Sequence, residues 1–114
     1  MLFQKKKKNA GVDDELLRRL ETLSFRYVTE RDPETLREKR LGDGGAANVI
    51  DGEFVIVCGG RNVLRCPLDR VTAAELMNRS GLTAKGFDLD EGREKSVIAY
   101  YSDGSVGVDR AKRR

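Results

Sequence analysis

Residues 46–66 read AANVIDGEFVIVCGGRNVLRC, and they carry the clearest structural signal in the 114-residue chain. The apolar runs 46–50 and 53–58 flank Asp51-Gly52, a dipeptide that tolerates the positive φ angles of a two-residue hairpin turn. Gly59-Gly60 then leads into a third run at 62–68. Because side chains alternate across a strand, one face of these strands should supply core residues: Phe54, Ile56, Cys58, Leu64, Cys66 and Leu68.

The second half of the chain continues this pattern of apolar runs separated by turns. Strands are predicted at 82–89, 95–101 and 105–108. The turns between them are Asp90-Glu91-Gly92 and Ser102-Asp103-Gly104. With the three earlier strands, these runs predict a curved antiparallel sheet of about five to six strands.

An amphipathic helix is predicted at 13–24. Asp13-Asp14-Glu15 supply an N-cap and an acidic first turn. Apolar residues then recur at helical spacing. The next residues, 25–30, are also rich in β-prone side chains, so the pattern leaves them open between the end of the helix and a strand.

Two shorter helices are predicted from capping signals. Asp32-Pro33-Glu34 is a typical helix start and Leu41-Gly42 a typical stop, which favours a short surface helix at 33–41. Thr72-Ala73-Ala74-Glu75 matches a capping box, which favours a helix at 73–79 over a further strand. With helices beside an antiparallel sheet, the predicted fold class is α+β.

Positive charge is concentrated at the two ends of the chain. The formal net charge is +3, but residues 9–109 hold 14 basic against 19 acidic residues, a net charge of −5. We therefore expect a flexible basic tail at 1–12, a single α+β domain at 13–109 and a second basic tail at 110–114. The tails could contact phosphates of nucleic acid or of anionic lipid through these side chains: Lys5, Lys6, Lys7, Lys8, Arg110, Lys112, Arg113 and Arg114.

The residue types that most catalytic and metal sites use are scarce. The chain has no histidine, the commonest general base and metal ligand. Four carboxylates surround a predicted turn and are interpreted as turn residues rather than as a catalytic pair or a cation site: Asp88, Asp90, Glu91 and Glu94. The glycine runs at 42–45 and 59–60 lack the flanking elements and the lysine of a phosphate-binding loop. We therefore expect no enzymatic activity, no cofactor and no metal.

Cys58 and Cys66 are expected to be reduced and buried on strands. A bridge between them would turn residues 59–65 into a loop and would take Val63 and Leu64 out of their strand. Reduced thiols, no signal peptide at the N-terminus and no long apolar run together predict a cytoplasmic protein without a transmembrane segment.

Four stretches between about 46 and 108 are similar to sequences of a known domain family: EFVIV (53–57), VLRCPLDRV (63–71), GLTAKG (81–86) and SVIAYY (96–101). They resemble the pleckstrin-homology-like domains of many bacterial proteins. The resemblance implies a bent antiparallel sheet that serves as a binding module, usually capped by a C-terminal helix. This chain has no such helix after Val108, and Asp51-Gly52 lacks the basic residues that phosphoinositide-binding members use.

The leading functional hypothesis is a non-enzymatic binding or regulatory module that interacts with another protein. The alternative is a nucleic-acid-associated protein that binds phosphates through its basic tails. A homodimer is a third hypothesis, because the strand at 105–108 would leave an exposed edge guarded only by Asp103 and Asp109.

Overall fold

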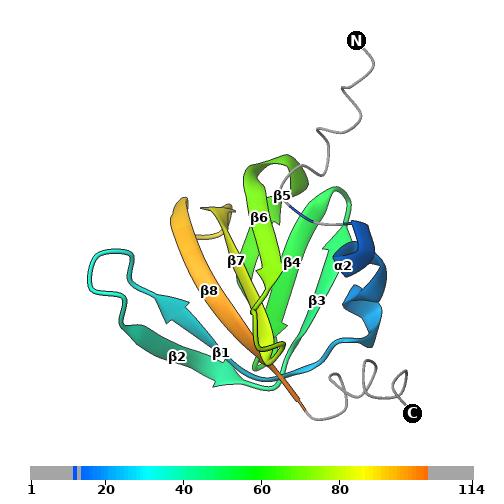
Figure 1. Ribbon diagram of the computed structural model, residues 1–114. Helices are drawn as coiled ribbons and strands as arrows, with labels where there is room; N and C mark the ends of the chain where they lie inside the picture. Colours follow the sequence, from blue (N-terminus) through cyan, green and yellow to red (C-terminus); the bar gives the residue numbers. More distant parts are fainter. Residues whose placement is uncertain (1–11, 13, 103–114) are drawn as a thin grey trace.

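The computed structural model describes residue 12 and residues 14–102, which form a short helix and two antiparallel sheets (Figure 1). One sheet has the strand order β2-β1-β8-β7-β6 and the other the order β3-β4-β5. The described part is therefore nearly all β, and the predicted α+β class is wrong.

The elements are α2 (Asp14–Arg19), the 3-10 turn η1 (Leu20–Thr22), β1 (Phe25–Arg31), β2 (Glu38–Asp43), β3 (Ala46–Ile50), β4 (Glu53–Cys58), β5 (Arg61–Pro67), the 3-10 turn η2 (Leu68–Arg70), β6 (Val71–Glu75), β7 (Gly81–Asp88) and β8 (Arg93–Tyr101).

Two sharp corners join the sheets, so that together they wrap around one core (Figure 1). At the first corner, β2 continues through Gly44 and Gly45 into β3. Gly45 has a φ of 146°, and a Cβ at this position would collide with the carbonyl oxygen of Val57. At the second corner, β5 continues through η2 into β6. The first corner depends on glycine, because no other residue tolerates both this φ and this close approach.

The core lies between the two sheets and is closed on one side by the N-terminal helix. The face predicted from residues 46–68 is confirmed: Phe54, Ile56, Cys58, Leu64 and Cys66 are buried, and Leu68 packs half-buried against them. Leu82 and Val97 bring the facing sheet into the same cluster. Three leucines, Leu16, Leu20 and Leu23, come from α2, η1 and the residue after it.

Most of the predicted strands are confirmed. The strands at 46–50 and 53–58 have the predicted bounds, and those at 62–68, 82–89 and 95–101 differ by one or two residues at their ends. Asp51 and Gly52 have φ values of 51° and 77°, as their hairpin turn requires. The strand predicted at 105–108 lies outside the described residues.

The N-terminal helix is shorter than the predicted 13–24. Its α-helical part is Asp14–Arg19, followed by η1, and Asp13 lies outside the described residues. The residues that the sequence left open, 25–30, fall within β1, which pairs with β8 from Phe25 opposite Tyr101. The helix ends before Phe25, because the residues that follow form backbone hydrogen bonds with β8 as a strand.

The predicted helix at 33–41 is wrong. Residues 33–35 form a turn, Leu36 has a φ of 64°, and β2 follows. The Asp32 side chain does accept backbone N–H groups, as a helix cap would, but here it stabilises a hairpin turn. With two apolar residues in the whole segment, a helix would have almost no face to bury, whereas β2 gains a ladder of hydrogen bonds with β1.

The predicted helix at 73–79 is also wrong. Residues Val71–Glu75 form β6, in which buried Val71 and Ala73 alternate with exposed Thr72 and Ala74. The Glu75 side chain does not cap a helix and instead accepts hydrogen bonds from Arg19 and Tyr101. Pairing with β7, from Val71 opposite Gly86, overrides the local capping signal.

Candidate functional site

The β1–β2 hairpin projects away from the rest of the molecule (Figure 1). β1 pairs with β8 only as far as Glu30, opposite Val97, while β1 and β2 stay paired to Arg31 opposite Glu38. The turn of the hairpin extends beyond the β1–β8 pairing, and a cavity of about 580 Å³ lies between it and Arg93 of β8. We call this cavity the hairpin cleft; its lining residues are Glu30, Asp32, Pro33, Thr35, Arg37, Glu38, Lys39 and Arg93.

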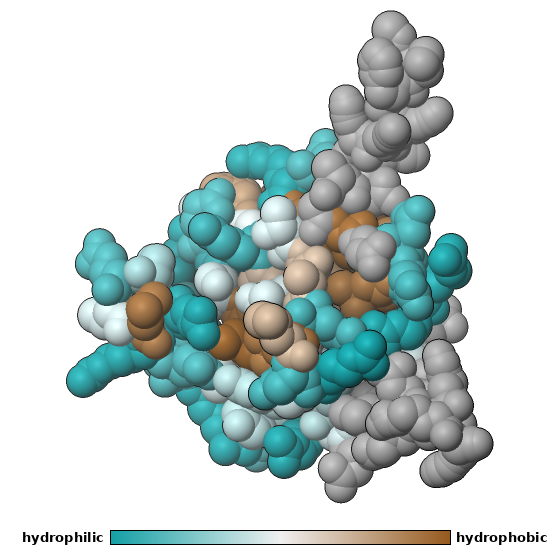
Figure 2. Space-filling view, in the orientation of Figure 1, coloured by the Kyte–Doolittle hydropathy of each residue, from teal (hydrophilic) through white to brown (hydrophobic). Residues whose placement is uncertain are grey.

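The tip of the hairpin is held by local hydrogen bonds. Asp32 Oδ1 accepts the N–H groups of Glu34 at 2.8 Å and Thr35 at 3.4 Å. The backbone N–H of Asp32 donates to the Arg37 carbonyl at 2.9 Å and closes the turn. Leu36 stands out of this turn with 65% of its surface exposed, and Figure 2 shows a hydrophobic spot on the otherwise hydrophilic hairpin. The tip is therefore ordered by its own contacts while presenting an apolar side chain.

The carboxylates of the hairpin cleft are engaged by donors of the chain itself. Glu30 forms an ion pair with Arg93 at 2.8 Å. Glu38 Oε1 accepts hydrogen bonds from the hydroxyls of Thr29 and Tyr100, each at 2.8 Å. These two bonds, the Thr29 bond being the stronger cause, lower the pKa of Glu38 below its ordinary value. Glu38 is therefore ionised at neutral pH, and Glu30 is held by Arg93.

The cations of the hairpin cleft fall into two kinds. Arg93 lies between Glu30 at 2.8 Å and Glu91 at 2.7 Å, and its bond to Glu30, then that to Glu91, raises its pKa. Arg37 and Lys39 make no side-chain hydrogen bond or ion pair with any residue that the structure describes. Lys39 nevertheless lies opposite Glu30 in the β1–β2 register, and Arg37 lies opposite Asp32 at the turn, so the lining has as many acidic as basic residues.

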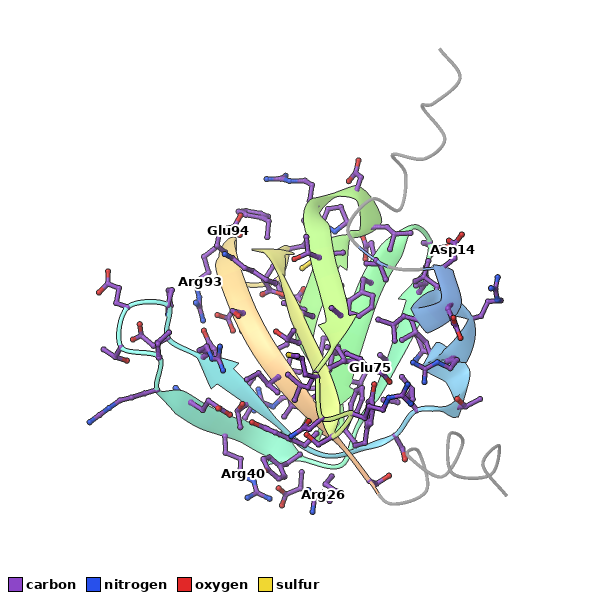
Figure 3. The ribbon with its side chains drawn as sticks, in the orientation of Figure 1. Asp14, Arg26, Arg40, Glu75, Arg93 and Glu94 are labelled. Carbon is purple, nitrogen blue, oxygen red and sulfur yellow. The ribbon has the colours of Figure 1, made fainter. Side chains whose placement is uncertain are left out.

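A cluster of tyrosine and arginine side chains lies on the other side of the hairpin, and we call Tyr27, Arg40 and Tyr100 the tyrosine–arginine face. The two tyrosine rings have centroids 4.8 Å apart. The Arg40 guanidinium lies 4.2 Å from the Tyr27 centroid and is held by an ion pair with Asp43 at 2.6 Å. In Figure 3, Arg40 and Arg93 lie on opposite sides of the hairpin ribbon. Aromatic rings in contact with each other and with an arginine are typical of protein interfaces.

Tyr100 ties this face to the hairpin. Its hydroxyl donates to the carboxylate of Glu38, which lies on the same side of β2 as Arg40 and on the opposite side from Lys39. Burial, and after it the hydrogen bond to Glu38, raises the pKa of Tyr100 to about 12. The phenol therefore keeps its proton at neutral pH and remains a donor to Glu38.

Asp88 is one of the four carboxylates around the predicted turn. It is buried, and it connects two parts of the fold through hydrogen bonds. Only 1% of its surface is exposed. Its Oδ1 accepts the backbone N–H of Arg65 and its Oδ2 accepts that of Glu91, both at 2.8 Å. This carboxylate joins the β7–β8 turn to β5, so both of its oxygens serve the fold.

The neighbouring carboxylates are held in ion pairs on the surface. Asp90 pairs with Arg65 at 3.0 Å. Glu91 pairs with Arg93 and with Lys95 at 2.9 Å, and these bonds, the one to Lys95 first, lower its pKa. Glu94 is exposed on β8. Among the described residues, no three histidine, cysteine, aspartate or glutamate side chains gather as a metal site would require.

The two cysteines are free and buried, as predicted. Burial raises the pKa of the Cys66 thiol to about 12, with the negative charge of Asp88 as the next cause. Burial likewise raises the pKa of Cys58. Both thiols are therefore protonated at neutral pH, and the thiolate form that attacks electrophiles is disfavoured.

The sequence predictions and the structure point to different candidate residues. The basic side chains proposed as phosphate contacts, Lys5, Lys6, Lys7, Lys8, Arg110, Lys112, Arg113 and Arg114, all lie outside the described residues. The sequence does not reveal the hairpin cleft, because its capping signals predict a helix at 33–41 that would contain Arg37 and Lys39. The β-prone segment 25–30 is the signal that could reveal the hairpin. A strand in this segment must pair with another strand, and the residues that follow it in the sequence can form that strand.

No protein-family model, curated protein or solved structure matches the chain. No helix of the described part is both long and apolar enough to cross a membrane. The described part thus defines a class, an antiparallel β protein of two joined sheets with a projecting hairpin.

Proposed function

We propose that this protein is a non-enzymatic binding module that docks a partner protein on its β1–β2 hairpin. The observation that carries the proposal is the projecting hairpin itself, with a cleft of mixed charge on one side and the tyrosine–arginine face on the other. Both surfaces are formed by the same two strands and by β8, so one partner segment could contact them together.

The tyrosine–arginine face is already in an ordered arrangement. Arg40 is held by Asp43 and by the Tyr27 ring, and Tyr100 is held by Glu38. Ordering a flexible side chain on binding costs about 0.5–1.5 kcal/mol, so a partner that meets these side chains already in place avoids that cost. Tyrosine and arginine are also the residue types that contribute most to binding at protein interfaces.

The outer edge of β2 supports the same proposal. β2 is the end strand of its sheet, and Glu38, Lys39 and Arg40 are exposed. Charged side chains on an edge strand hinder unspecific pairing with other chains. The backbone of such a strand can still pair with an added strand whose side chains complement those charges.

The state of the acidic and thiol groups supports a non-enzymatic role. General acids and bases at neutral pH need pKa values near that pH. The pKa values of Glu38 and Glu91 are lowered, and those of Cys58 and Cys66 are raised. The shifts therefore move these groups away from the range that proton transfer or nucleophilic attack requires.

The proposal can be tested by selecting peptides from a random displayed library on the full chain. Bound peptides are then located by the shifts of backbone amide signals in NMR spectra. We expect the shifts to map to Tyr27, the residues of β2 and Tyr100. The variant Arg40→Ala should weaken binding, whereas Arg70→Ala, which removes a matched arginine stacked on Phe87 at 4.7 Å, should not.

Two outcomes would contradict the proposal. The first is that no peptide is selected, or that selected peptides shift signals away from the hairpin. The second is that duplex DNA binds the full chain and loses its affinity on removal of residues 1–8 and 110–114, which would favour the nucleic-acid alternative. The resemblance to pleckstrin-homology-like domains remains a proposal of the same functional class, a sheet that binds partners.

A further inference from the structure

We infer that the partner docked on the hairpin is a second copy of this chain, which pairs antiparallel with β2 and places Glu38 of each copy against Arg40 of the other. The inference rests on the proposed function, because it names the partner that the hairpin binds. It depends on three observations on β2: the direction of its free backbone groups, the order of its charges, and the unused side-chain atoms of Glu38 and Arg40.

Glu38 and Arg40 direct their backbone groups away from the sheet. The N–H of Asp32 donates to the carbonyl of Arg37 at 2.9 Å, which makes these two residues a hydrogen-bonded pair. Along an antiparallel ladder, such pairs alternate with pairs whose N–H and C=O groups point outward. In the β1–β2 register, Glu38 and Arg40 belong to the outward pairs. Because β2 is the end strand of its sheet, their N–H and C=O groups face a free edge.

The free edge of β2 is short. The guanidinium of Arg61 donates to the carbonyl of Leu41 at 2.9 Å and occupies the edge after Arg40. On the other side of Glu38 lies the turn of the hairpin. An added strand therefore bonds to the backbone of Glu38 and Arg40, and we expect the resulting dimer to be weak.

The order of the charges selects one alignment of the two copies. A two-fold axis that brings the outward-directed residues face to face can place Glu38 opposite itself, Arg40 opposite itself, or Glu38 opposite Arg40. The first two alignments put like charges together, which is unfavourable across strands. The third puts opposite charges together on both sides of the axis. Arg31 lies opposite Glu38 on β1, so the charges alternate across the joined sheets.

Glu38 and Arg40 each keep a side-chain atom available for the second copy. Glu38 accepts the hydroxyls of Thr29 and Tyr100 at the same oxygen, Oε1. Arg40 donates to Asp43 through Nε and Nη2. Within the part of the chain that the structure describes, Glu38 Oε2 and Arg40 Nη1 have no hydrogen-bond partner. Both side chains are already held in place, so a bond between these atoms across the axis needs little further ordering.

Lys39 opposes the pairing and thereby offers a test of the alignment. With Glu38 opposite Arg40, Lys39 faces Lys39 of the second copy on the other side of the joined sheets. Glu30 lies opposite Lys39 within each chain and offsets part of this repulsion. We therefore expect Lys39→Gln to tighten the dimer.

Sedimentation equilibrium of the full chain, at concentrations up to about 1 mM, measures the association. We expect a dissociation constant on the order of 100 μM. Glu38→Arg and Arg40→Glu each create like-charge pairs on both sides of the axis, so each should weaken the dimer about tenfold or more. The matched control Glu94→Arg reverses an exposed glutamate on β8 that lies far from Arg40 in Figure 3, and it should leave the association unchanged.

Mixing the two charge-reversal variants provides the specific test. A Glu38→Arg copy has only basic side chains at the two positions, and an Arg40→Glu copy has only acidic ones. The mixture should therefore dimerise at concentrations where neither variant does so alone. A side chain that only supports the fold of its own chain would not restore association on mixing. Thermal melts verify that each variant is folded.

Backbone amide signals in NMR spectra locate the interface. As the protein concentration rises, the amide signals of Glu38 and Arg40 should shift. The amide of Lys39, which is directed at β1, should shift less. Concentration-dependent shifts on another strand would overturn the inference.

The outcomes separate this inference from the proposed function. A chain that stays monomeric up to about 1 mM, or a dimer that neither charge reversal weakens, would overturn the second copy as the partner. If peptides selected from the library still bind the hairpin in that case, docking on the hairpin stands. Failure of both the second copy and the peptides would overturn the inference and the proposed function together.

Discussion

The hydroxyl of Tyr100 donates a hydrogen bond to Glu38 at 2.8 Å, across 62 residues of sequence. Tyr100 lies on β8 and Glu38 on β2, the strands on either side of β1. The bond therefore ties the projecting hairpin to the sheet on the side of the tyrosine–arginine face.

Replacing Tyr100 by phenylalanine should loosen this tie in a pH-dependent way. Because the bond lies at the surface, we expect Tyr100→Phe to lower the free energy of unfolding by about 1 kcal/mol or less at neutral pH. The folded-state pKa of Glu38 is lowered, so its contribution is present above the ordinary value of 4.5 and is lost as pH falls through the folded value. Urea unfolding of both proteins above and below pH 4.5 should show the deficit shrinking in acid. A deficit that is the same at both pH values would contradict this origin.

Removing the buried Asp88 carboxylate should destabilise the protein strongly. Asp88→Ala leaves the backbone N–H groups of Arg65 and Glu91 without their acceptor. Two hydrogen bonds to a buried charged group suggest a loss of about 2–4 kcal/mol in urea unfolding. The matched control is Asp90→Ala, which removes a partly exposed ion pair with Arg65 and should cost less than about 1 kcal/mol. Similar losses for the two variants would argue against Asp88 as the tie between β5 and the β7–β8 turn.

The corner between the two sheets should tolerate a side chain at Gly44 but not at Gly45. Gly44→Ala places a Cβ in open space at a φ of 70° and should cost about 1 kcal/mol. Gly45→Ala combines a φ of 146° with a collision against the Val57 carbonyl and should cost about 3 kcal/mol or more. Thermal melts of the pair measure the difference, and equal melting temperatures would refute this account of the corner.

The thiols should be unreactive in the folded protein. Burial raises the pKa of Cys66 to about 12 and that of Cys58 above its ordinary value of 9.0. A thiol-specific reagent at neutral pH should therefore label the folded chain orders of magnitude more slowly than the chain in urea. The unfolded chain loses its thiol protons at lower pH than the folded chain, so stability should fall as pH rises past 9.0. Rapid labelling of the native protein would show that one of the cysteines is accessible.

The meander from β3 to β5 follows from local signals in the sequence. Asp51-Gly52 favours one hairpin geometry, and alternation around it places Phe54, Ile56 and Cys58 on one face. The turn signal and the period of two lie within a few residues of each other, so neither depends on a distant contact. The strands at 46–50 and 53–58 could therefore be predicted residue by residue.

The segments 33–41 and 73–79 follow their strand partners instead. Both carry sound helix-start residues, but capping signals contribute only about 1 kcal/mol. A helix at 33–41 would have only Leu36 and Leu41 to bury, and a helix at 73–79 only a short stripe of Ala73, Leu76 and Met77. Pairing with β1 and with β7, the neighbouring strands in the sequence, outweighs the capping signals. The same holds for the hairpin cleft, because Arg37, Lys39 and Arg93 meet only where the turn of the hairpin extends beyond the β1–β8 pairing. Local chemistry specified the turns and the buried face, while long-range strand pairing specified which charges share a surface.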